Sequence, residues 1–174
     1  MVDQDPKQVI IDFLNVPREG KVKAKATAIH FLKERIIPGC QIHAVAFEDE
    51  FGQHFHGYFA LGQDSTSTWH ISGATLSEGD TGTHDPIHNQ PWVNLFGGGG
   101  YGTDFYAGGY VNDIGAGIEA VNLVSDNGIV LKDSVEHGLV LFVMDQPVEM
   151  PMKAELYDQT GKLVASHNAF PIPY

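Results

Sequence analysis

A cluster of histidines is the clearest chemical pattern in the sequence. Six of the nine histidines lie between residues 43 and 88, and a single residue separates His54 from His56. On a β-strand, residues two apart point to the same side and lie roughly 7 Å from each other. Two imidazoles at that spacing suit a divalent metal such as Zn²⁺. The pair predicts a metal site in which His84 and His88 are further ligands from a loop.

The same histidines are more typical of the solvent-facing side of a sheet. A metal site needs three or four converging ligands and the groups that orient them. The main interpretation is therefore a protein with no cofactor, whose histidines are neutral or hydrogen-bonded. A metal-binding protein, or a metal-dependent enzyme that uses the His54 and His56 pair, is the alternative.

A second set of residues suits ligand binding without catalysis. The region from Gly73 to Gly109 is rich in glycine and contains four candidate aromatic residues, namely Trp92, Tyr101, Phe105 and Tyr106. Exposed rings of this kind form a stacking platform for a sugar or peptide, whereas buried rings plug one end of a sandwich. Long irregular loops are uncommon inside a domain and are often functional. The alternative is a long crossover between two sheets.

Familiar catalytic motifs lack their context in this chain. Gly97, Gly99 and Gly102 have the spacing of a dinucleotide loop, but no helix follows them and there is no βαβ unit. The sequence contains no Gly-x-Ser-x-Gly elbow. Cys40 is the single cysteine, and a lone cysteine beside a strand is typically a small buried apolar residue. The sequence therefore favours a non-catalytic binding or interaction module over an enzyme.

Short apolar runs predict the strands that would position these residues. Five runs in the second half are rich in Val, Ile and Leu and are separated by turn residues: 117–124, 129–135, 139–144, 152–157 and 163–167. The run 139–144 contains no polar residue and is expected in the centre, buried on both faces. The run 152–157 alternates, which is typical of a strand with one exposed face.

Three turns with one shared chemistry connect predicted strands. Each has Asp or Ser, two variable residues and Gly, at 49–52, 125–128 and 158–161. The Asp or Ser side chain accepts backbone hydrogen bonds, and the Gly takes the positive φ of a three-residue hairpin loop. In the first hairpin this loop length predicts that Phe47 faces Phe55. Repeated hairpins predict antiparallel sheets.

Residues 1–37 are expected to form a helical appendage that packs on the sheet. Asp5 and Pro6 are typical of a helix start, and apolar residues follow at helical spacing as far as Leu14. A second helix is predicted from about Lys21 to Glu34, because apolar residues and lysines lie on opposite sides of it.

Together these features predict a mainly β domain with an N-terminal helical segment. Residues 38–174 are expected to form an antiparallel β-sandwich of about eight or nine strands, immunoglobulin-like in general architecture. Two short helices precede it, and the irregular glycine-rich loop 73–109 interrupts it.

Charge and hydropathy narrow the range of partners. The net charge is −12, and residues 1–35 hold seven of the ten Lys and Arg, so the rest is strongly acidic. An acidic body repels phosphate and argues against nucleic-acid binding. No membrane span or signal peptide is visible, so the default expectation is a cytoplasmic protein, with export through a trimmed leader left open. Expected partners are a protein, peptide or sugar, or a second copy paired through sheet edges.

Overall fold

The chain folds into one helix and eleven strands within the residues that the structure describes. This computed structural model describes residues 4–17, 23–79, 89–100 and 103–170. The elements are α1 (Pro6–Asn15), β1 (Ala24–Ile37), β2 (Cys40–Asp49), β3 (His54–Gln63), β4 (Trp69–Glu78), β5 (Trp92–Gly100), β6 (Thr103–Asn112), β7 (Ile118–Ser125), β8 (Val130–Ser134), β9 (Leu139–Met144), β10 (Met152–Asp158) and β11 (Leu163–Phe170). None of the described helical residues forms a helix long and apolar enough to cross a membrane.

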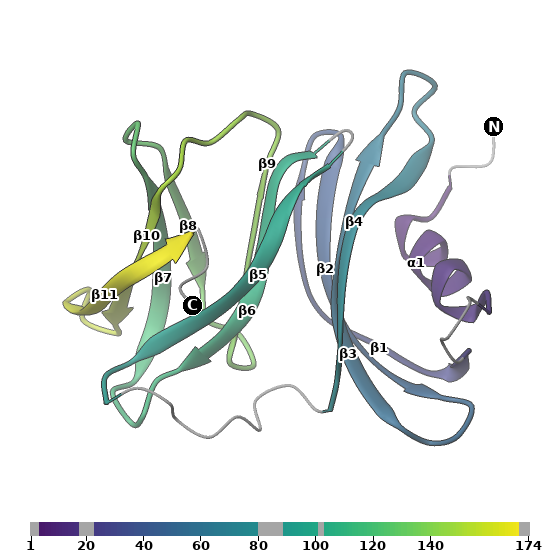
Figure 1. Cartoon of the computed structure of the whole chain (residues 1–174), viewed down its shortest axis with the longest axis horizontal. Helices are drawn as coiled ribbons and strands as arrows, with labels where there is room; N and C mark the ends of the chain where they lie inside the picture. The colour runs from purple at the N-terminus through teal and green to yellow at the C-terminus, as the bar shows by residue number, and fades with distance from the viewer. Residues whose placement is uncertain (1–3, 18–22, 80–88, 101–102, 171–174) are drawn as a thin grey trace.

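The strands form three antiparallel sheets. The first sheet has the order β1-β2-β3-β4, the central sheet β5-β6-β9, and the third sheet β11-β10-β7-β8. Figure 1 shows the central sheet between the other two, with α1 on the outer face of the first sheet. The mainly β character and the N-terminal helix are therefore confirmed.

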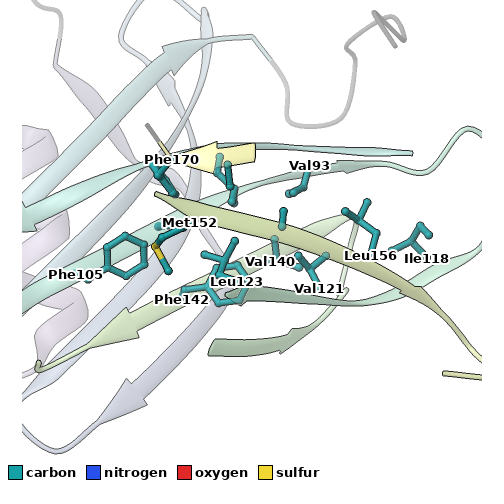
Figure 2. Packing of buried hydrophobic residues seen from close by; sticks show 14 residues of the cluster. Val93, Phe105, Ile118, Val121, Leu123, Val140, Phe142, Met152, Leu156 and Phe170 are labelled. Atoms are coloured by element: carbon teal, nitrogen blue, oxygen red, sulfur yellow. The ribbon is translucent and has the colours of Figure 1, made fainter. Parts of the chain in front are cut away.

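Three clusters of buried apolar residues fill the spaces between these layers. One lies under α1 and includes Ile10 and Phe59, and the next lies between the first and central sheets. The largest lies between the central and third sheets, where Val140 and Phe142 of β9 meet Leu123 and Leu156 (Figure 2). Alternate residues of β9 enter different clusters, so this strand is buried on both faces as predicted. It nevertheless forms one edge of its hydrogen-bonded sheet.

The three predicted turns are confirmed in detail. Gly52, Gly128 and Gly161 have φ between 81° and 85°. Each glycine N–H donates to the carbonyl oxygen of the residue that opens its turn, at 3.0 Å. The register of the first hairpin is also as predicted, since Phe47 pairs with Phe55 and their rings stack with centroids 5.3 Å apart.

The predicted second helix is wrong, because most of residues 21–34 lie in the long strand β1. Helical and strand periodicity are hard to distinguish here because β1 contains a β-bulge. Phe31 pairs with Val45 and Lys33 with Ala44, so Leu32 is one residue too many. A bulge of this kind reverses which residues face each side of the sheet. Lys33 and Arg35 therefore point toward the central sheet.

Much of the predicted loop 73–109 is also strand. β4 continues to Glu78, and β5 and β6 form a hairpin, whereas residues 80–88 lie outside the described residues. The glycines reflect close packing rather than irregularity. A Cβ on Gly109 would lie 1.7 Å from the Asn94 carbonyl oxygen, and one on Gly108 would lie 2.4 Å from Tyr58 Cδ1. These glycines let a strand and an aromatic ring approach the backbone of β6.

Candidate functional site

A pocket of mixed polar and apolar character lies between the end of β6 and the turn that precedes β9. Its volume is about 370 Å³, within the range of small-molecule sites. We call it the two-turn pocket, and it is lined by Asn94, Tyr110, Val111, Asn112, Asp113, His137 and Gly138. Asn94 and Tyr110 are partners across the β5–β6 ladder, so these two strands build one wall.

Two tight turns border this pocket. In the turn from Asp113 to Ala116, Ile114 and Gly115 have φ of 45° and 82°, and Ala116 N–H donates to the Asp113 carbonyl oxygen at 2.8 Å. In the turn from Glu136 to Leu139, the two central residues have φ of 53° and 74°. Two positive φ values define a type I′ turn, the type that matches strand twist in hairpins.

Ile114 is in an unfavourable backbone conformation. The left-handed region normally costs an L-residue about 1–2 kcal/mol, and it is a marked outlier for a β-branched side chain. The side chain is 42% exposed, so burial in the core does not offset this cost. Strain of this kind concentrates at functional sites. Ile114 directly follows Asp113, which lines the pocket.

A buried ion pair lies behind the second turn. The side chains of Lys33 and Asp133 are 0% and 2% exposed, and Lys33 Nζ is 2.8 Å from Asp133 Oδ2. The ammonium also donates to the carbonyl oxygens of Ser134 and Leu139. An ammonium has three N–H donors, and these three acceptors match them. Asp133 in turn accepts from Leu141 N–H at 2.7 Å.

The electrostatics of this pair fit a structural role. Burial lowers the pKa of Lys33, while the hydrogen bond and the charge of Asp133 oppose that shift. A lysine with a lowered pKa can serve as a nucleophile. Here the ammonium lies among three fixed acceptors in a site closed to solvent, which suits anchoring rather than reaction.

Arg35 extends the network to the turn itself. Its Nε donates to Asp133 Oδ1, and its Nη2 lies 2.7 Å from Glu136 Oε1. The hydrogen bonds from Arg35 and Ser134 lower the pKa of Glu136. Glu136 immediately precedes His137, whose neighbour Gly138 accepts a hydrogen bond from Val111 N–H. The first sheet is thus connected through side chains to the pocket wall.

The pocket wall also touches the core between the first and central sheets. Tyr110 lines the pocket and lies next to His56, with ring centroids 5.8 Å apart. Tyr58 is buried beside them, and burial together with Tyr110 raises its pKa. Tyr58 therefore remains neutral at physiological pH.

The predicted metal ligands are only partly described. His54 is exposed at the start of β3, whereas His56 is buried with its Nδ1 2.9 Å from the Gly79 carbonyl oxygen. His84 and His88 lie outside the described residues. Within the described ranges, no group of three or more His, Cys, Asp or Glu is placed to hold a metal ion. The four-histidine site stays a prediction.

The predicted aromatic platform divides among different places. Phe105 and Tyr106 are buried in separate core clusters, and Tyr101 lies outside the described residues. Trp92 is half-buried and stacks on His167, with centroids 3.6 Å apart. His167 Nε2 accepts from Val93 N–H, so this stack joins β5 to β11. Phe105 and Tyr106 thus stabilise the core, and Trp92 alone of the four lies near the surface among the described residues.

Sequence reasoning missed the pocket because its residues come from three separate segments. The available signals were the dipeptides Ile114-Gly115 and His137-Gly138, since Gly is typical of the second central position of a type I′ turn.

No family model, curated protein or solved structure matches this chain.

Proposed function

We propose that this protein is a non-catalytic binding module that takes a small uncharged sugar in the two-turn pocket. The observation that carries the proposal is the chemistry of the lining. Asn94 and Asn112 offer amide donors and acceptors, Asp113 offers a carboxylate, and His137 offers an imidazole. Sugar hydroxyls both donate and accept, and such mixed groups satisfy them.

Charge favours a neutral ligand over an anionic one. The lining residues include Asp113 and neither lysine nor arginine, and the whole chain carries a net charge of −12. A phosphate or carboxylate ligand would be repelled.

The finer architecture is part of the same proposal. We infer that the central and third sheets act as the β-sandwich expected from the sequence, with the first sheet and α1 as additional layers. Loops at the ends of such sheets commonly carry binding sites. Self-association through sheet edges stays a prediction, which sedimentation over a concentration series would test.

The proposal is tested by titrating the protein with neutral mono- and disaccharides, using glucuronate as the charged counterpart of glucose. Amide resonances are followed by NMR, and affinities are measured by calorimetry. At least one neutral sugar is expected to shift residues 110–115 and 136–138 selectively. Asn112→Ala should weaken that sugar about tenfold, the loss expected for roughly 1.4 kcal/mol of hydrogen bonding.

Asn168→Ala is the matched control, because Asn168 is an exposed asparagine on β11 that does not line the pocket. This variant should bind like the native protein. The proposal is wrong if no neutral sugar binds at millimolar concentration, if glucuronate binds better than glucose, or if both asparagine variants behave alike.

A further inference from the structure

We infer that the ion pair between Arg35 and Glu136 holds the His137 turn in its binding conformation and thereby sets the ligand affinity of the two-turn pocket. Both residues would be positioning residues, since neither lines the pocket. The affinity part of this inference rests on the proposed sugar-binding function. The conformational part does not, because the turn can be observed without any ligand.

The bulge in β1 makes the ion pair geometrically available. Lys33 and Arg35 pair with Ala44 and Ile42 of β2, whose side chains belong to the core cluster between the first and central sheets. Without the extra residue Leu32, they would face the helix side of the sheet instead. The bulge therefore points two cations of the first sheet at residues 133–139.

The two cations contact this segment in different ways. Lys33 is enclosed and contacts Asp133 and two carbonyl oxygens, that of Ser134 before the turn and that of Leu139 at its end. Arg35 is 33% exposed, and its Nη2 contacts Glu136, the first residue of the turn, at 2.7 Å. Lys33 thus anchors the turn where it enters β9, whereas Arg35 holds its first residue.

The turn depends on an external contact because, among the described contacts, the side chain of its first residue accepts no backbone hydrogen bond inside the turn. Glu136 and Leu139 exchange two backbone hydrogen bonds, of 3.1 and 2.9 Å, across an isolated bridge. The three predicted turns instead begin with an Asp or Ser whose side chain accepts backbone hydrogen bonds inside its own turn. Glu136 directs its carboxylate outward to Arg35 and Ser134.

Glu136→Gln tests the inference because it removes the charge and keeps the size of the side chain. We expect the Leu139 amide to exchange its hydrogen at least about fivefold faster, because the turn opens more often. The neutral sugar identified in the native protein should bind about three- to tenfold more weakly. Glu136→Asp should restore part of both properties if the carboxylate is what matters.

Glu48→Gln is the matched control. Glu48 also forms an exposed salt bridge, with Lys25 at 2.8 Å, but it lies on the first hairpin away from the pocket. This variant should change neither the Leu139 exchange rate nor the affinity for the sugar.

The outcomes separate this inference from the proposed function. Unchanged Leu139 exchange in Glu136→Gln would overturn the inference, whatever the protein binds. Faster exchange with undiminished sugar affinity would overturn it as well. Faster Leu139 exchange in Glu136→Gln and not in Glu48→Gln supports it even when the native protein binds no sugar, a result that overturns the proposed function alone.

Discussion

The two faces of the first sheet bury polar groups in opposite ways. On the face toward the central sheet, Lys33 is charged, 0% exposed and paired with Asp133. On the face under α1, His43 is 1% exposed, and burial lowers its pKa to about 4. Its Nε2 lies 2.9 Å from Gln41 Oε1, so the imidazole is neutral and hydrogen-bonded to a neutral partner.

The difference shows when a charge can stay inside this fold. Burying an ion is costly unless its partners satisfy it, and otherwise the group becomes neutral. Lys33 has a carboxylate and two carbonyl oxygens within bonding distance. His43 has Glu34 Oε2 3.5 Å from its Nδ1, and Glu34 is half-exposed and shared with Lys7. That partial compensation is too weak to keep the imidazole protonated.

Removing the partner of the enclosed charge should have the largest effect. Asp133→Ala would leave the Lys33 ammonium buried without its carboxylate. It would also remove an acceptor for Leu141 N–H. Breaking a buried pair in this way costs about 3–5 kcal/mol. We expect urea unfolding to show a loss of free energy of unfolding in that range, and a loss below 1 kcal/mol would contradict our account of the inner face.

A double variant sharpens this prediction. Replacing Lys33 by Met together with Asp133 by Leu removes both charges and keeps apolar volume, a change that is often nearly neutral. Some cost remains because Leu141 N–H and Arg35 Nε both lose their acceptor. The double variant should therefore be at least about 1 kcal/mol more stable than Asp133→Ala alone. Equal stability would mean that the uncompensated ammonium is not the cause.

The helix side should instead be sensitive to acid. The ordinary pKa of histidine is 6.5, and that of His43 in the fold is about 4. Between these values the unfolded chain binds the proton and the folded chain does not, so stability falls as the pH falls. The full shift corresponds to about 3 kcal/mol. This stability is complete above pH 6.5 and is lost progressively down to pH 4.

The measurement is the free energy of unfolding at several pH values between 6.5 and 4.5, a window in which ordinary carboxylates are mostly ionised. In His43→Gln the free energy of unfolding should change less with pH than in the native protein, whatever its absolute value. His30→Gln changes an exposed histidine on β1 and should leave the slope as in the native protein. Parallel slopes in the native protein and His43→Gln would show that His43 is not the acid-sensitive group.

The sequence predicts the features of this fold that depend on neighbouring residues better than those that depend on which face of a sheet a residue occupies. Local sequence patterns predict the structure correctly where a hydrogen-bonding side chain and its backbone partner lie within a few residues of each other. The turns at Asp49 and Asp158 and the start of α1 are examples. The pattern of β1 suggests a helix because its alternation is interrupted twice, between Ala24 and Ile29 and again at Leu32. A strand that changes faces midway has no single period to detect.

The pocket depends on contacts between distant segments, and no short pattern contains it. Asn94, Asn112 and His137 are brought together by the pairing of β6 with β5 and with β9.

A fourth turn, at residues 64–67, was missed because it lacks the glycine of the other three. Asp64 accepts hydrogen bonds within the turn as predicted elsewhere, but Ser67 takes the positive φ of 63° in place of glycine.

The smallest expected effect lies at the start of α1. Asp5 is the N-cap, and its Oδ1 accepts from Lys7 N–H at 3.0 Å. Replacing an N-cap Asp by Ala costs about 1 kcal/mol. We expect Asp5→Ala to lower the free energy of unfolding by about that amount. Because α1 covers only the outer face, exchange of the Leu139 amide on the opposite side should stay unchanged.

Asp12→Ala is the matched control for this variant. Asp12 lies within α1 and accepts a hydrogen bond only from the exposed Gln8 side chain among the described contacts, so its loss should change stability by less than about 0.5 kcal/mol. If both aspartate variants cost the same, capping is not the reason. If Asp5→Ala accelerates Leu139 exchange, the two faces of the first sheet are coupled, and the division between a helix side and a pocket side is wrong.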